Sequence, residues 1–339
     1  MPINICMLQK LEQLKSIHIE LTTRCNARCP MCVRNYRGHD YNSGYPTCEL
    51  TLADIEKMFT AKVLSRLQGC TANFNGNVGD FSNARDGVEI VKFFIDHNIK
   101  VTINTNGSTR STDWWSRLAL PGVSIGFALD GLADTHHLYR QDTDWQKIID
   151  NASAYIAAGG HAVWRFVPFD HNRHQEQACK DMSRVLGFKR FENIYDGRDR
   201  GPVYKRDGEF SHWLGPAEKS APPIKDMLQS HVTWFRAETV DVPKDTADIT
   251  YNCQHKRAQE IYIAANGTVY PCCYLGFYPG QMTHPGNEQL LPLVHENNAL
   301  EYGLEHGMAW FDRVKATWAK SSIREGRLYQ CVNSCGSVK

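Results

Sequence analysis

The chain has 339 residues, 42% of them hydrophobic and 22% charged, and its 38 Lys and Arg residues almost balance its 37 Asp and Glu residues. This balance gives no overall field that would favour nucleic acid or an anionic membrane as a partner. The sequence also lacks an apolar run long enough for a membrane helix and a basic, then apolar, N-terminal signal, so we expect a cytoplasmic protein.

Strand-like and helical patterns alternate over the first two-thirds of the chain. Strands are predicted at residues 17–21, 70–75, 99–104, 122–129, 161–168 and 188–194, and helices between them at 51–67, 86–98, 111–119, 145–158 and 172–186. Six strands that alternate with helices predict an α/β fold with a parallel sheet and right-handed crossovers. Because six units are too few for a complete eight-stranded barrel, we expect an open, partial (β/α)6 TIM-like barrel.

The pattern changes after residue 195. Residues 196–249 contain Gly-Pro and Pro-Pro steps, which predict a bridging segment with one short helix near 224–236. Residues 250–339 carry a second group of cysteines and are predicted to form a small α+β domain. The expected domains are therefore the barrel at 1–195, the bridge at 196–249 and the cysteine-rich domain at 250–339.

Twelve cysteines stand out in a chain expected in a reducing compartment, where structural disulfides are rare and metal ligation or catalysis is the usual role. Cys25, Cys29 and Cys32 form a C-x3-C-x2-C run directly after the first predicted strand. Thiolates are the usual ligands of four-iron clusters, which normally take four, so this run leaves one iron open. A structural zinc site is the alternative, but zinc closes all four positions and no partner pair lies nearby.

This run resembles the signature of the radical S-adenosylmethionine (SAM) superfamily, and the resemblance covers about residues 15–195. It implies a [4Fe-4S] cluster on Cys25, Cys29 and Cys32 whose open iron binds SAM. It also implies SAM contacts in the loops after successive strands, at Gly76, Asn77, Gly79, Asp80, Asn104, Asn106 and Arg140. The family cleaves SAM reductively to a 5′-deoxyadenosyl radical, which abstracts a substrate hydrogen atom.

The second cysteine group surrounds a predicted β-hairpin. Residues 260–271 contain an Asn-Gly turn between two strand-like runs, which brings Cys253 and Cys272 together. The C-x13-G-x4-C spacing resembles the opening of SPASM and twitch domains, and the shorter twitch type implies one auxiliary [4Fe-4S] cluster on Cys253, Cys272, Cys331 and Cys335. A closed four-thiolate zinc site is the alternative, and Cys273 can take the place of Cys272.

The domain plan resembles that of radical SAM dehydrogenases with a twitch domain. It implies oxidation of a small polar metabolite, with the auxiliary cluster as electron acceptor and a flavodoxin or ferredoxin as electron donor. A peptide-modifying maturase and a radical epimerase remain open, as does a non-catalytic zinc- or iron–sulfur-binding protein. Asp170 and His171 are candidate bases, and Cys48 and Cys273 are the spare cysteines expected within reach of the cavity.

Overall fold

The computed structural model describes residues 10–39, 46–195, 201–215, 220–227, 249–277 and 286–338. The chain divides into two compact units, one made of residues 20–49 and 73–228 and the other of residues 1–19, 50–72 and 229–339. All six predicted strands are present: β1 (Ser16–Ile19), β2 (Thr71–Asn75), β3 (Lys100–Thr105), β4 (Val123–Ala128), β5 (His161–Phe166) and β6 (Arg190–Asn193). Among the described residues, no helix has both the length and the apolar character that crossing a membrane requires.

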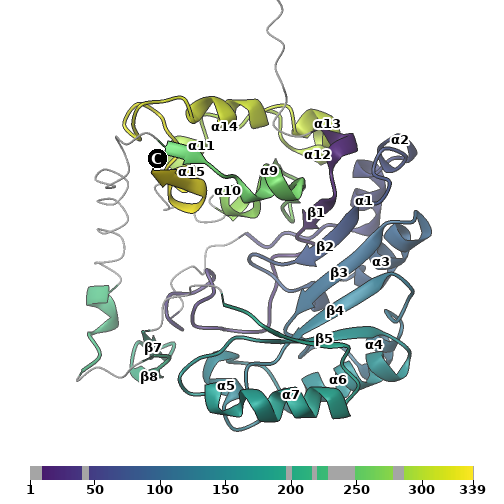
Figure 1. The fold of residues 1–339 in the computed structure, drawn as a ribbon, viewed down its shortest axis with the longest axis vertical. Helices are drawn as coiled ribbons and strands as arrows, with labels where there is room; N and C mark the ends of the chain where they lie inside the picture. The colour runs from purple at the N-terminus through teal and green to yellow at the C-terminus, as the bar shows by residue number, and fades with distance from the viewer. Residues whose placement is uncertain are drawn as a thin grey trace, which may run out of the picture. The chain divides into compact units, whose positions relative to one another are not determined.

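The unit of residues 20–49 and 73–228 contains a sheet in the order β2-β3-β4-β5-β6, in which β3 to β6 pair in parallel (Figure 1). The helices are α3 (Gly87–Asp96), α4 (Thr112–Ser116), α5 (His136–Tyr139), α6 (Trp145–Ala157) and α7 (Glu176–Val185), with short 3-10 turns at Phe81–Asn83 and Arg173–Gln175. Each successive strand is thus reached through a helical connection, which confirms the prediction of a partial TIM-like barrel.

The two faces of this sheet differ in polarity because side chains alternate along a strand. The helix-facing side carries fully buried aromatic residues, among them Trp115 from α4, Phe127 from β4 and Trp164 from β5. The other face is polar: Thr102 Oγ1 on β3 donates to Asn73 Oδ1 on β2 over 3.2 Å. The aromatic layer therefore stabilises the sheet, and the polar face remains available for a site.

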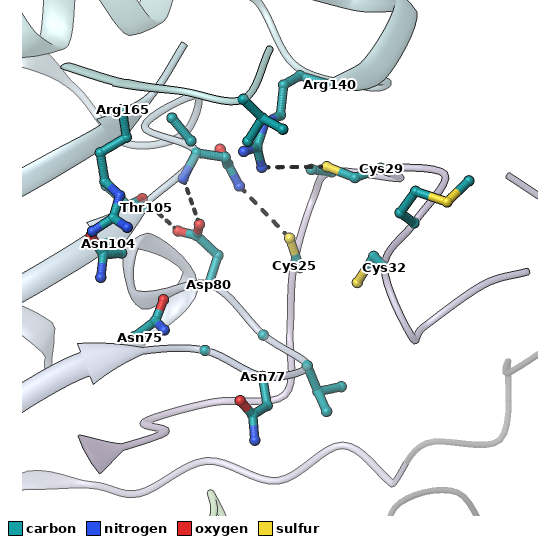
Figure 2. A pocket seen from close by; sticks show the side chains of 18 of the residues that line it. Cys25, Cys29, Cys32, Asn75, Asn77, Asp80, Asn104, Thr105, Arg140 and Arg165 are labelled. Carbon is teal, nitrogen blue, oxygen red and sulfur yellow. Dashed lines mark hydrogen bonds between the residues drawn. The ribbon is translucent and has the colours of Figure 1, made fainter. Parts of the chain in front are cut away.

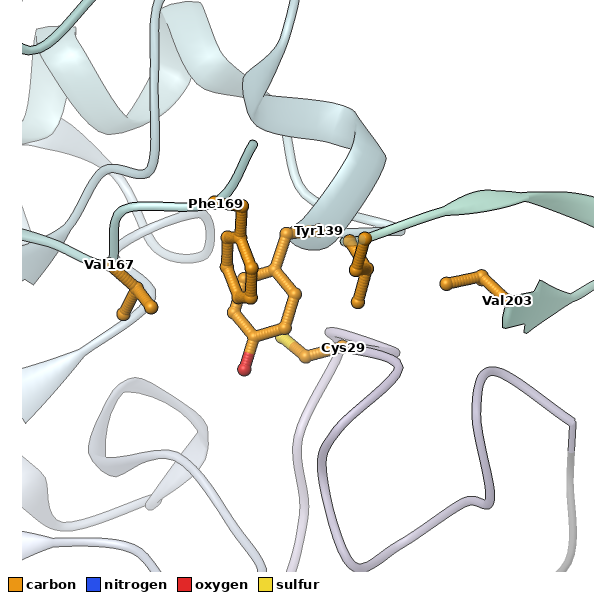
Figure 3. Close-up of a cluster of buried hydrophobic side chains, with 6 residues drawn as sticks. Cys29, Tyr139, Val167, Phe169 and Val203 are labelled. Atoms are coloured by element: carbon orange, nitrogen blue, oxygen red, sulfur yellow. The ribbon is translucent and has the colours of Figure 1, made fainter. Parts of the chain in front are cut away.

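A β-hairpin that the sequence pattern did not predict lies in the bridging segment. β7 (Pro202–Tyr204) and β8 (Phe210–Trp213) pair antiparallel. Val203 on β7 and Leu214, the residue after β8, are fully buried. They pack in one cluster with Cys29, Tyr139 and Phe169 (Figure 3). Of the helix predicted near 224–236, residues 224–227 are helical and the rest lies outside the described residues.

The other unit contains strands in the order β11-β10-β1. β10 (Glu260–Ile263) and β11 (Val269–Tyr270) form the predicted hairpin, with Gly267 in its turn at φ +83°, and β10 also pairs in parallel with β1. β9 (Ile249–Tyr251) pairs with β12 (Gly336–Val338). The helices are α1 (Leu52–Met58), α2 (Ala61–Leu64), α9 (Gln254–Ala258), α10 (Cys273–Phe277), α11 (Gly286–Leu290), α12 (Ala299–Tyr302), α13 (Leu304–Gly307), α14 (Phe311–Thr317) and α15 (Tyr329–Cys335), with a 3-10 turn at Leu11–Gln13.

Substitution of Phe127 tests whether the aromatic layer stabilises the sheet. Its ring is fully buried, 5.2 Å from the Trp115 ring and 6.2 Å from the Tyr155 ring between centroids. We expect Phe127→Ala to lower the free energy of unfolding by about 3–5 kcal/mol because burial is lost and a cavity remains. Urea denaturation followed by circular dichroism measures the change. The control is Val185→Ala, which is 87% exposed and should stay within about 0.5 kcal/mol of the parent; equal losses in both variants would contradict this assignment.

Candidate functional site

A cavity of about 420 Å³ lies at the carboxyl ends of β2 to β5 (Figure 2). Its volume falls within the roughly 300–1,000 Å³ typical of small-molecule sites. The cavity wall brings together every residue predicted to hold the first cluster or SAM: Cys25, Cys29, Cys32, Gly76, Asn77, Gly79, Asp80, Asn104, Asn106 and Arg140. Polar residues at strand ends that are far apart in the sequence thus share one wall.

The three cysteines lie on the loop that follows β1. Cys29 is buried against Tyr139 and Phe169, and the Cys32 amide donates to the Cys29 carbonyl oxygen over 2.9 Å. Burial raises the pKa of the Cys25 thiol, and Asp80 and the other two cysteines raise it further. Such thiols become thiolates only when a bound cation compensates their charge, which is how metal sites select this ligand.

The three thiols are the donor type that a four-iron cluster takes, with each thiolate bound to a different iron. The cavity wall supplies three cysteines, Cys25, Cys29 and Cys32. A structural zinc site instead closes all four positions of one ion. Three thiolates on one wall therefore fit a cluster that leaves one iron open.

The loop from Gly76 to Asp80 is held by Glu20, which is almost fully buried and which the sequence analysis did not identify. The amides of Val78 and Gly79 donate to Glu20 Oε1 over 2.6 and 2.7 Å. A Cβ atom on Gly79 would overlap the Thr22 carbonyl oxygen, so only glycine permits this approach of the two backbones. In the sequence, the only indication of this role was the position of the Glu20 carboxylate next to an otherwise apolar strand.

Asp80 connects the ends of β2 and β3. Its Oδ1 accepts hydrogen bonds from the Thr105 hydroxyl (2.7 Å) and from the amide and hydroxyl of Ser82, and its Oδ2 accepts one from the Asn106 amide (2.7 Å). These bonds orient Asn106, whose Nδ2 lies 3.7 Å from Cys25 Sγ. Asp80 therefore positions the wall of the cavity through its neighbours.

Arg140 and Asp130 form the corresponding pair at the end of β4. Arg140 Nε donates to Asp130 Oδ2 over 2.5 Å, and Asp130 Oδ1 accepts from the Val167 amide over 2.6 Å. Burial opposes the charge of Arg140, but the Asp130 carboxylate outweighs it and raises the pKa of the guanidinium. Arg140 Nη1 points at Cys29 Sγ over 3.7 Å, so a second donor faces a cysteine sulfur (Figure 2).

Three weaker candidates do not line the cavity. Asp170 is exposed and pairs with Arg173 over 3.0 Å, and the amide of Cys48 donates to Thr23 Oγ1 over 2.9 Å. The ring of His171 stacks on Phe169, and burial lowers the pKa of His171 to about 4. The structure therefore does not support these residues as bases or hydrogen donors in this cavity.

In the other unit, Cys253, Cys272, Cys331 and Cys335 line a second cavity of about 20 Å³. A hydrogen bond between two of these thiols raises the pKa of Cys253 and lowers that of Cys335 to about 6. A four-iron cluster would need more room, so the four side chains would have to move apart to hold one. The set nevertheless supplies the four thiolates that such a cluster takes.

Cys273 does not belong to this group of four. Its Sγ lies 3.9 Å from His255 Nε2, and His255 Nδ1 lies 3.0 Å from Glu260 Oε1. Burial disfavours the thiolate, but hydrogen bonds from His18 and His255 lower the pKa of Cys273 to about 7. The structure thus separates two adjacent cysteines that the sequence could not distinguish.

Comparison with known proteins agrees with this geometry. Residues 19–180 match the sequence model of the radical SAM superfamily. These residues form a radical SAM domain. Among curated proteins no sequence matches the chain.

Crystal structures of Streptococcus suis SuiB share the fold at 14% sequence identity. SuiB alone gives a TM-score of 0.53, with 87% of this chain and 65% of SuiB covered. SuiB bound to SAM gives 0.52 (87% and 64%), and SuiB bound to the precursor peptide SuiA gives 0.54 (94% and 76%). In the first two comparisons the chain therefore spans less than two thirds of SuiB, and at this identity the similarity concerns the fold alone.

His136, beside the Asp130–Arg140 pair, makes the stability of the fold depend on pH. The ring is buried, and its Nδ1 accepts a hydrogen bond from the Asp130 amide over 3.2 Å. Burial, followed by the charges of Arg140 and His137, lowers the pKa of His136 to about 3. Between about pH 6.5 and pH 3 the unfolded chain therefore binds a proton at His136 that the folded chain does not. The free energy of unfolding consequently falls as the pH decreases through this range, and the contribution of neutral His136 is fully present above about pH 6.5.

We expect the parent to lose about 2–3 kcal/mol of stability through His136 between pH 7 and pH 4.5. The His136→Gln variant should have a smaller dependence of unfolding free energy on pH over this range, as measured by urea denaturation at several pH values. The control is His97→Gln, because that residue is exposed and directly follows α3. Parallel pH profiles for the parent and His136→Gln would contradict the assignment.

Proposed function

We propose that this chain is a radical SAM enzyme in which Cys25, Cys29 and Cys32 hold a [4Fe-4S] cluster and the adjoining loops hold SAM. The observation that carries this proposal is the convergence of the three cysteines with the strand-end loops on one cavity. When bound, the cluster and SAM supply a 5′-deoxyadenosyl radical that abstracts a hydrogen atom from the substrate.

The chain's own residues orient these groups. Asn106 and Arg140 direct N–H donors at the sulfurs of Cys25 and Cys29, and hydrogen bonds to ligand sulfurs tune the potential of a cluster. The loop around Gly76 and Gly79 keeps backbone atoms close to the cavity. Apolar side chains such as Met31 and Ile194 line the same wall and exclude water from it.

The second cysteine group bears on the outcome of the reaction. An auxiliary cluster on Cys253, Cys272, Cys331 and Cys335 would accept an electron from the substrate radical, and this favours dehydrogenation of a small polar metabolite. The first electron would come from a flavodoxin or ferredoxin. The second cysteine group then acts as a twitch-like domain of an oxidoreductase.

A peptide-modifying maturase is the second candidate. The observation in its favour is the fold shared with SuiB in complex with its precursor peptide SuiA, which covers 94% of this chain. Redox-neutral modification, such as epimerisation, would not need an electron acceptor in the second cysteine group. The iron content of that group therefore distinguishes the chemical outcomes more directly than the fold does.

Iron and SAM cleavage test the first site together. Anaerobically reconstituted parent protein should contain about 8 iron atoms per chain, and a variant with Cys25, Cys29 and Cys32 changed to Ala about 4. With dithionite and SAM, the parent should form 5′-deoxyadenosine and the variant should not, because only the first cluster meets SAM. An iron-loaded parent that leaves SAM intact would instead support a non-catalytic iron–sulfur protein.

The two adjacent cysteines provide a matched pair for the second site. We expect Cys272→Ala to lower the iron content below the parent's value of about 8 atoms per chain, because the auxiliary cluster loses one of its four thiolates and is held less firmly. Cys273→Ala should retain about 8, since its thiol faces His255. Zinc in the parent in place of the second set of iron atoms, or equal losses in both variants, would contradict an auxiliary cluster with these ligands.

A further inference from the structure

We propose that Arg165, held by Asn104, forms an anion-recognition subsite that binds a carboxylate of the substrate. This inference rests on the proposed function and deepens it, because it names the class of substrate that the radical would attack: a small molecule or peptide side chain that carries a carboxylate. It also assigns Asn104, which the sequence placed with SAM, to the substrate.

Arg165 reaches its position by crossing a strand. It lies on β5 and Asn104 on β3, with β4 between them. Arg165 Nη1 donates to Asn104 Oδ1 over 2.6 Å, directly above Gly126, which is paired with Asn104 in the sheet register. A Cβ atom on Gly126 would lie 2.5 Å from Arg165 Cδ and 2.7 Å from Asn104 Oδ1. The missing side chain on β4 is therefore what lets the two residues meet.

The charge of Arg165 faces the cavity. Its side chain lines the wall and is 32% exposed, whereas that of Arg140 is 16% exposed and tightly paired with Asp130. The carboxylate of Glu192 lies 4.0 Å from Arg165 and is engaged by Arg190 at 3.0 Å. Among the charged side chains of this wall, Arg165 is the cation most open to a ligand in the cavity.

The position of Arg165 separates it from the cysteines. Figure 2 shows Arg165, Asn104 and Asn75 grouped at one end of the cavity, with Cys29 and Cys32 at the other and Asp80 between them. A ligand anchored at Arg165 would therefore extend towards the cysteine end, where SAM is proposed to bind. This is the arrangement that a hydrogen-abstracting enzyme needs, because the substrate carbon must face the SAM-derived radical.

The chemistry of the group indicates a carboxylate. A guanidinium presents a planar fork of donors that matches the two oxygens of a carboxylate, and such charge-assisted pairs are about twice as strong as neutral hydrogen bonds. The neighbouring Asn104 and Asn75 add neutral amides and no further positive charge. The guanidinium already lies 4.0 Å from the Glu192 carboxylate, so a singly charged carboxylate suits this end of the cavity better than a phosphate with its larger charge.

Calorimetric titration of reconstituted, SAM-saturated enzyme tests the subsite with glutarate and its neutral analogue glutaramide. Glutarate should bind the parent at least about tenfold more tightly than glutaramide, and Arg165→Gln should remove this preference. Arg165→Lys keeps the charge but not the fork, so it should recover only part of the preference. The matched control is Arg184→Gln, on the exposed side of α7.

Gly126→Ala supplies a second variant that changes no polar group. Because the added methyl group meets only side-chain atoms of Arg165 and Asn104, the chain should fold, and Arg165 should be displaced. We expect glutarate binding to weaken several-fold in this variant, as in Asn104→Ala. Circular dichroism confirms that each variant is folded before its titration is interpreted.

Several outcomes overturn the inference. A parent that binds SAM without preferring glutarate to glutaramide, or an Arg165→Gln variant that keeps the preference, contradicts the subsite. A loss of SAM affinity in Arg165→Gln equal to its loss of glutarate affinity would assign the guanidinium to the carboxylate of SAM. Failure of the proposed function is distinguishable, because it appears as a parent that holds iron yet neither binds nor cleaves SAM.

Discussion

A carboxylate that is removed from water must have its oxygens hydrogen-bonded or ion-paired, and at the strand ends of this sheet that requirement falls on Asp80 and Asp130. Asp80 meets it with donors from the β2–α3 connection and the end of β3. Asp130 meets it with Arg140 and the Val167 amide at the end of β5. Asp80 therefore links the ends of β2 and β3, and Asp130 links the ends of β4 and β5, on the wall of the cavity.

The same hydrogen bonds determine which side-chain donors face the cysteine sulfurs. Asn106 is oriented through Asp80 and points its amide at Cys25, while Arg140 is oriented through Asp130 and points its guanidinium at Cys29. Groups held this way need little reorganisation when a ligand binds, which is the basis of preorganised sites. The hydrogen bonds of Asp80 and Asp130 thus couple the stability of the sheet to the geometry of the cavity.

The sequence predicted the features that depend on local pattern and missed those that depend on contacts distant along the chain. Alternating polarity located all six strands, and the spacing of Cys25, Cys29 and Cys32 placed them on one loop. The role of Glu20 depends on amides 58 and 59 residues away, and no periodicity reveals it. The separation of Cys272 from Cys273 depends likewise on where His18 and His255 lie after folding.

The polar inner face of the sheet explains why this barrel encloses a cavity. A complete TIM barrel fills its interior with layers of large branched side chains. Here the corresponding positions hold Asn73, Thr102 and Ser124 in one row and Asn75, Asn104 and Gly126 in the next, which are short, polar or without a side chain. Such residues cannot form a dry core, because buried amides and hydroxyls need partners. They bond to one another and to neighbouring side chains, as Thr102 does to Asn73, Ser124 to His161 and Asn104 to Arg165. Because these side chains are also short, they leave the space that forms the cavity.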